Sequence, residues 1–263
     1  MSSQLNMNSD TRLLSIYHNY SSTYDFLFWF DAKSMLMSWW IEPLAATVGF
    51  SASIALFDAL EAKEGAPPRE GFSHFAMMLY WAAVWVWTLI VPLQEGIPLG
   101  IGGDEVSVAL LAAEVIAGII AYDALFFFAH WGMHSFTWTN RNVHAFHHAY
   151  SEKRLRARDV LTHSPLDGAL QVLANIAAQR FVAISGPKSK LARCIHNLLV
   201  TFMLTESHTS AKSCRLFRRF CAGVQRHRSH HGGAAYYQQF FGYLDDARRG
   251  FVDRSRASRC KSK

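Results

Sequence analysis

One stretch of the chain decides its fold: VSVALLAAEVIAGIIAYDALFFF, from Val106 to Phe128, followed after one alanine by HWGMH, from His130 to His134. Its first part is a long apolar run that is interrupted only by Glu114 and Asp123. The two histidines follow at positions i and i+4, which lie about 40° apart around a helix axis, so both imidazoles can reach one metal ion. The stretch therefore predicts a membrane helix that leads into a metal-binding pair.

Several other regions share this apolar character. Met35 to Phe57 is a long apolar run. Gly71 to Leu93 contains no Asp, Glu, Lys or Arg, exceeds the ~20 residues that a helix needs to cross a bilayer, and is the strongest prediction of a membrane span. Two weaker runs, Gly168 to Ile184 and Leu191 to Leu204, are joined by a short polar linker and indicate either a membrane hairpin or helices that enter the membrane without crossing it alone. We therefore expect an all-α integral membrane bundle with about four membrane segments.

The composition agrees with a membrane protein. Charged residues make up 17% of the 263 residues, whereas soluble domains have about 25%. The hydrophobic share of 51% excludes a disordered chain, and 4 cysteines are too few for a disulfide scaffold of this length. We expect residues 1–34 to form an interfacial segment and residues 35–263 a single domain, with a histidine-rich catalytic part at 123–243.

The basic residues indicate the orientation. The loop at 94–104 lacks Lys and Arg, whereas the segments around 141–158 and 212–263 are basic. Because cytosolic loops carry an excess of Lys and Arg, the first loop should face the lumen and the two basic segments the cytosol. The clustered histidines then form a helical cap on the cytosolic side.

Most of the 13 histidines lie in three clusters: His130-Trp-Gly-Met-His134, His144-Ala-Phe-His147-His148 and His227-Arg-Ser-His230-His231. In the HxxHH pattern the last two histidines diverge by about 100° around a helix, so one short helix can serve two centres. This spacing predicts a dinuclear site, although imidazole alone does not select the metal.

The spacing alone assigns the roles of four isolated residues less directly. His196 lies within an apolar run, where a hydrogen-bonded core histidine is expected. His163 and His208 lie level with the clusters, and their spacing alone leaves ligation open. Asp123 shares a helix stripe with His130 and His134, so it either orients an imidazole or forms a hydrogen bond between helices.

These elements together resemble the fatty acid hydroxylase/sterol desaturase superfamily of integral membrane diiron enzymes. The resemblance covers about Asp123 to Phe241, including a His-Pro element with an acidic partner at His163 to Asp167 and a single histidine at His208. It implies that both of these histidines join the metal shell and that Asp123 and Asp167 support ligands from behind. The implied ligands are His130, His134, His144, His147, His148, His163, His208, His227, His230 and His231.

The resemblance further implies an oxidoreductase, a monooxygenase or desaturase that uses two iron ions, O₂ and two external electrons. Its substrate would be a lipid, a sterol or a terpenoid- or polyketide-like molecule, oxidised at an unactivated C–H position. Deformylation of an aldehyde, another reaction of the family, stays open. Zinc is expected as a substitute in purified protein, and no catalytic residue is assigned beyond the metal centre.

The electron source is expected to be another protein, because the chain contains no flavin or nicotinamide motif. NAD(P)H would supply electrons through cytochrome b5 and its reductase, at the endoplasmic reticulum membrane. The basic face, which includes Arg154, Arg156, Arg158, Arg215, Arg218 and Arg219, either docks this donor or contacts lipid headgroups. We expect no nucleic-acid partner.

Two rival functions compete with an oxygenase. A catalytic zinc ion usually has three protein ligands and a water, so ten candidate histidines are too many for one zinc hydrolase site. A membrane scaffold or metal-binding protein without turnover is the alternative from another class. Product formation that depends on O₂ and reductant distinguishes it from an enzyme.

Overall fold

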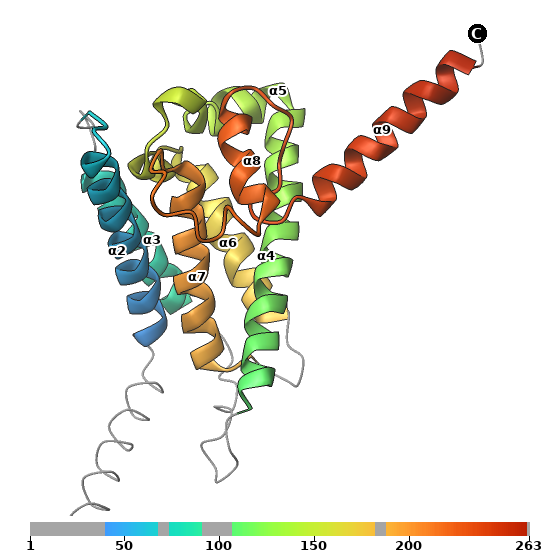
Figure 1. Cartoon of the computed structure of the whole chain (residues 1–263). Coiled ribbons are helices and arrows are strands. Elements are labelled where there is room, and N and C mark those ends of the chain that lie inside the picture. The colour runs from blue at the N-terminus through green and yellow to red at the C-terminus, as the bar shows by residue number, and fades with distance from the viewer. Residues whose placement is uncertain (1–39, 68–73, 91–106, 182–187, 262–263) are drawn as a thin grey trace, which may run out of the picture. The chain divides into compact units, whose positions relative to one another are not determined.

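The computed structural model describes residues 40–67, 74–90, 107–181 and 188–261, which contain helices and no strand. The longer helices are α2 (Ile41–Lys63), α3 (His74–Ile90), α4 (Val108–Ser135), α6 (Pro165–Phe181), α7 (Lys190–His208), α8 (Ala222–His231) and α9 (Tyr243–Lys261). Figure 1 shows α4, α6 and α7 side by side, with α8 at one end of this group and α9 leading away from it. The expected all-α fold class is confirmed.

Short helical turns connect α4 to α6 above the bundle. They are α5 (Thr137–Thr139), η1 (Asn140–His144), η2 (His147–Ala149), η3 (Glu152–Arg154) and η4 (Ala157–Leu161). η1 is a single π turn closed by a 2.8 Å hydrogen bond from the Ala145 N–H to the Asn140 carbonyl. Such turns occur often at functional sites, and this one ends at the buried His144.

Two helices in the described part of the chain, α2 and α4, are long and apolar enough to cross a membrane. Large apolar side chains on α2, α3 and α4 are exposed, which suits contact with lipid: Leu44, Val48, Leu56, Met78, Leu79, Trp81, Val86, Leu89, Val108, Ile116, Ile120, Leu125 and Phe128. Within α3 the apolar part is Met77–Val86, shorter than a span. The expectation of about four membrane segments is therefore not confirmed.

The hairpin expected from residues 168–204 corresponds to α6 and α7, with the linker at 182–187 outside the described residues. The buried face of α7 is polar and carries Arg193, His196, Asn197, Thr201 and Glu206. These side chains lower the hydropathy of α7 and bind partners inside the bundle. α7 therefore fits a helix that packs inside the protein better than a membrane span. The interfacial segment expected at 1–34 also lies outside the described residues, while Glu42–Lys263 form one compact unit.

The main core brings α4, α6, α7 and α8 together. Val115, Ile119, Tyr122 and Phe126 recur at three- and four-residue intervals on α4 and form one apolar stripe. Opposite them lie Ala178 of α6, Val200 and Met203 of α7, and Val224 of α8 with Phe240. This core holds the upper end of α4, where His130 and His134 lie, against α8.

Two further contacts fix the histidine-bearing end. The buried Glu61 at the end of α2 accepts hydrogen bonds from the Ala157 N–H (3.1 Å), the Thr209 hydroxyl (2.7 Å) and the Ser210 N–H (2.7 Å). Gly223 of α8 lets the backbone of Phe240 approach closely, because a Cβ there would lie 2.5 Å from the Phe240 carbonyl carbon. The segment after α8 is therefore held tightly beneath the histidines.

Candidate metal centre

Nine of the ten expected ligands converge in two groups whose ligand nitrogens lie within 4.8 Å of one another. The first group comes from α4, the turns η1 and η2, and α8, and the second adds α7. The first contains His130, His134, His144, His148 and His230; the second contains His147, His208, His227 and His231. Residues up to about 100 positions apart therefore form two adjacent clusters of imidazoles.

Each HxxHH box contributes to both groups. His144 and His148 join the first group and His147 the second. In the other box His230 joins the first group, and His227 with His231 joins the second. The predicted divergence of the last two histidines in each box therefore agrees with their division between the two groups. The first box is built from a π turn and a 3₁₀ turn rather than the expected single helix, whereas α8 is helical throughout.

The outward ring nitrogens of five histidines are fixed by oxygen acceptors. Because a carbonyl or carboxylate only accepts, each Nδ1 must carry the hydrogen, which leaves Nε2 with a lone pair. The bonds run from His130 to the Tyr237 carbonyl (2.8 Å), from His144 to the Asp167 carboxylate (2.8 Å), from His147 to the Thr162 carbonyl (3.3 Å), from His208 to the Leu204 carbonyl (2.8 Å) and from His230 to the Ala234 carbonyl (3.1 Å).

The inward nitrogens face one another. The Nε2 atoms of His130 and His144 are 3.0 Å apart, and those of His208 and His147 are 3.4 Å apart. The two Nε2 atoms of each pair cannot hydrogen-bond to each other, since all four carry lone pairs and none carries a hydrogen. Two nitrogens bound to one ion at about 2.1 Å lie roughly 3.0–3.4 Å apart for ligand angles near 90–110°. The donor set therefore fits a metal cation in each group.

Burial keeps the imidazoles outside the membrane helices neutral. It lowers the pKa of His148 to about 3, and it lowers the pKa values of His147, His227 and His230 well below their usual range, with neighbouring imidazoles adding to the shift. A histidine binds metal through its neutral form. At neutral pH these side chains are ready to bind without first losing a proton.

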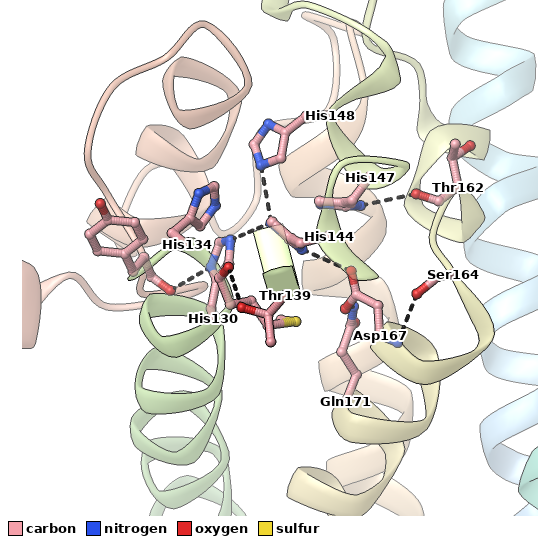
Figure 2. A network of polar contacts seen from close by, with 12 residues as sticks. His130, His134, Thr139, His144, His147, His148, Thr162, Ser164, Asp167 and Gln171 are labelled. Atoms are coloured by element: carbon pink, nitrogen blue, oxygen red, sulfur yellow. Dashed lines mark hydrogen bonds and ion pairs between the residues drawn. The ribbon is translucent and has the colours of Figure 1, made fainter. Parts of the chain in front are cut away.

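Figure 2 shows how α6 supports the first group. The fully buried Asp167 accepts from His144 through one carboxylate oxygen and from Gln171 Nε2 (2.9 Å) through the other. Its own N–H donates to the Ser164 hydroxyl (3.2 Å), which fixes the start of the helix. Asp167 thus supports a ligand from behind, in the role that the family resemblance implies.

Asp123 has a different role from either alternative considered above. Its carboxylate accepts from the backbone N–H groups of Gln239 (2.9 Å), Phe240 (2.7 Å) and Phe241 (2.9 Å), and from Gln238 Nε2 (2.7 Å). It therefore holds the segment after α8 and orients no imidazole directly. The reason is that this segment crosses α4 at the level of Asp123, one helical turn below Phe127.

The structure does not bring His163 into either group. Its ring packs against Gly168, where a Cβ would lie 2.6 Å from the His163 Cε1 atom, and it lines a cavity between the helices. His196 donates from Nε2 to the Asn175 side-chain oxygen (2.8 Å) and is fully buried. The interpretation of His196 as a hydrogen-bonded core histidine is confirmed.

Two residues that the sequence analysis did not single out also shape the centre. Tyr237 accepts from His130, and its ring packs on His134 and His230 at centroid distances of 5.3 and 5.8 Å. Asp245 accepts from the N–H groups of Tyr237 (2.9 Å) and Gln238 (2.8 Å) and so holds the tyrosine in place. No spacing rule links Tyr237 to α4, and only the Asp-rich start of α9 indicated a helix N-terminus there.

The cavity has a volume of about 310 Å³ and lies between α2, α3, α4, η4, α6 and α7. Its walls are mostly aliphatic and aromatic, with Phe50, Tyr80, Val172 and Leu204 among them. Its polar side chains include His163, Gln171, Asn175 and Thr201. Since Gln171 also contacts Asp167, the cavity reaches the residues directly behind the first metal group.

Comparison with protein families gives one match: a family described as fatty acid hydroxylase, over residues 115–248, just over half of the chain. The matched part runs from α4 through α8 into the start of α9 and contains all the histidines of both groups. Comparisons with curated proteins and with solved structures gave no match.

Proposed function

The chain belongs to the fatty acid hydroxylase family, and from that premise we propose that it is an O₂-dependent non-heme diiron oxidoreductase of the membrane. It hydroxylates or desaturates an unactivated C–H position of a hydrophobic lipid, sterol, terpenoid or polyketide-like substrate. The observation that carries this proposal is the convergence of nine imidazoles in two groups, with inward lone pairs placed to bind a metal cation.

The ligand count favours iron in two adjacent positions over a zinc hydrolase. Catalytic zinc sites usually use three protein ligands and a water, whereas these groups offer five and four histidines. Imidazole also binds zinc, so zinc is expected to replace iron in part during purification. Iron, when bound, supplies the one-electron redox chemistry and the O₂ binding that imidazoles lack.

The residues of the chain orient the imidazoles, bind the substrate and exclude water. Asp167 and the carbonyls of Thr162, Leu204 and Tyr237 hold the rings so that the lone pairs point inward. The apolar cavity accepts the substrate from the bilayer side and keeps it away from bulk water. No acid or base from the chain is required to remove hydrogen from a C–H bond in this scheme.

We further propose that electrons come from NAD(P)H through cytochrome b5 and its reductase. A surface hollow of about 330 Å³ near the metal centre is lined by Arg215, Arg218, Arg219 and Arg228, which suits an acidic donor protein. Part of this basic surface is structural: Arg218 donates to the Glu206 and Thr209 carbonyls, and Arg228 donates to the His208 carbonyl. Arg215 and Arg219 are thus the better candidates for docking.

The membrane in question is, we propose, the endoplasmic reticulum, with the histidines facing the cytosol. The two apolar helices α2 and α4 support membrane association. The basic residues of the connection between α4 and α6 lie at the same end of α4 as the histidines, in line with the preference of Lys and Arg for the cytosolic side.

Product analysis with the iron-loaded chain in membranes tests the proposal. The protein should convert one member of a panel of sterols, fatty acyl lipids, long-chain aldehydes and terpenoids only when O₂, NADH, cytochrome b5 and reductase are present. A deformylated product would select the alternative reaction of the family. Bound metal without any product from the panel would favour a metal-binding or scaffold protein instead. Full activity with zinc alone would refute the iron-dependent oxygenase.

A further inference from the structure

One short segment, Thr162 to Asp167, supports a ligand in each metal group. The Thr162 carbonyl accepts from His147 of the second group, and the Asp167 carboxylate accepts from His144 of the first (Figure 2). The segment therefore contacts ligands of both groups.

The segment also borders the cavity, and His163 faces it. Val160, Leu161, His163 and Pro165 line the cavity from this one stretch of chain. The His163 ring stands against Gly168, since a Cβ at this glycine would lie 2.6 Å from Cε1 and 2.9 Å from Nδ1 of the ring. Glycine at 168 thus makes the room that the imidazole occupies.

His163 also lies beside residues that support both groups. It directly follows Thr162, whose carbonyl accepts from His147, and its ring packs against Gly168, which directly follows Asp167. The imidazole is therefore part of the cavity wall that adjoins the supports of the metal ligands.

We propose that His163 is a substrate-binding residue and not a metal ligand, and that the substrate presents a hydrogen-bonding oxygen to it near the carbon that is oxidised. The inference rests on the proposed function and names its substrate class: a lipid with an alcohol, carbonyl, ester or amide group close to the reacting position. The middle of a saturated chain offers no oxygen to the imidazole, whereas an oxygen-bearing group can form a hydrogen bond with it.

Two measurements on the full-length, iron-loaded protein in detergent test this inference. The first is metal content by elemental analysis. The second is binding of 1-dodecanol and of dodecane, followed by native mass spectrometry; these probes differ by one hydroxyl. The variants are His163→Leu, His163→Gln and Gly168→Ala, which displaces the ring without changing it. Leu79→Ala, on the cavity wall contributed by α3, is the control.

The unaltered protein should bind dodecanol roughly 2- to 10-fold more tightly than dodecane, the range for one hydrogen bond. His163→Leu should abolish this preference at unchanged metal content, His163→Gln should keep part of it, and Gly168→Ala should weaken it. Leu79→Ala should weaken the binding of both probes equally. His147→Ala should lose metal and so show that the assay detects a missing ligand.

Loss of metal in His163→Leu and in Gly168→Ala would overturn the inference, because it would make His163 a ligand. A dodecanol preference that is absent from the unaltered protein, or that survives both substitutions, would also overturn it. Should His163→Leu not fold, the Gly168→Ala result decides alone. Neither readout needs turnover, so a protein that oxidises nothing but keeps a His163-dependent preference would refute the proposed function and leave only the ligand-binding role of His163 standing.

Discussion

Replacing Asp167 with Asn should weaken metal binding in one group of histidines and not in the other. Asp167 is fully buried, and its two oxygens accept from His144 and from Gln171. An Asn side chain keeps a single oxygen and can satisfy one of these donors. If its amide NH₂ faces His144, the imidazole must take the other tautomer, with a hydrogen on Nε2 where the lone pair should point at the metal.

The size of the effect follows from the position of Asp167 directly behind one ligand. Changes to groups that hold a ligating histidine typically cost 10- to 100-fold in metal affinity, which is about 1.4–2.7 kcal/mol. His144 belongs to the first group, and the histidines of the second group are supported by the Thr162 and Leu204 carbonyls instead. The loss should therefore be confined to one of two ions.

The loss of metal affinity is measured by removing iron stepwise with increasing concentrations of a chelator and following the metal content by elemental analysis. Asp167→Asn should release about half of its metal at roughly 10- to 100-fold lower chelator strength than the unaltered protein, and the rest at the same strength. Asp246→Asn is the matched control, because that exposed carboxylate pairs with Arg226 at the surface. A release curve identical to that of the unaltered protein, or equal weakening of both halves, would refute the reasoning.

Three further predictions follow. His230→Ala and His147→Ala remove ligands from different groups, so each should abolish product formation while lowering metal content by about half; complete metal loss in either variant would contradict separate binding of the two ions. Asp123→Asn leaves at least one buried backbone donor unsatisfied, at about 1–3 kcal/mol, so thermal unfolding should occur roughly 2–12 °C lower; an unchanged melting temperature would show that the segment after α8 is held by other contacts. Complete chelation should also lower the melting temperature, since the ions bind the folded chain alone; equal melting temperatures with and without metal would mean that the facing Nε2 atoms are satisfied in another way.

The sequence predicted α4 and the direction of its two histidines well, because both depend on local periodicity. The apolar run and the i, i+4 spacing are properties of one helix, and the helix indeed continues from Val108 through His134 to Ser135. In each HxxHH box the last two histidines belong to different groups; helical spacing explains this in α8, whereas the first box reaches the same division through a π turn and a 3₁₀ turn. Membrane segments were less predictable, since α7 contains an apolar run in its sequence and yet packs inside the bundle through a polar buried face.

The sequence by itself determined the helical fold class, the histidine clusters and the divergence of neighbouring histidines within them, because spacing along the chain fixes side-chain directions within a few residues. Only the tertiary structure decided which histidines meet, such as His130 with His144 and His147 with His208, since these contacts join separate helices. It also decided that Asp123 holds a backbone segment while Asp167 holds an imidazole, and that His163 faces a cavity. Each of these outcomes depends on what packs opposite a side chain, and long-range packing leaves no signature in local spacing.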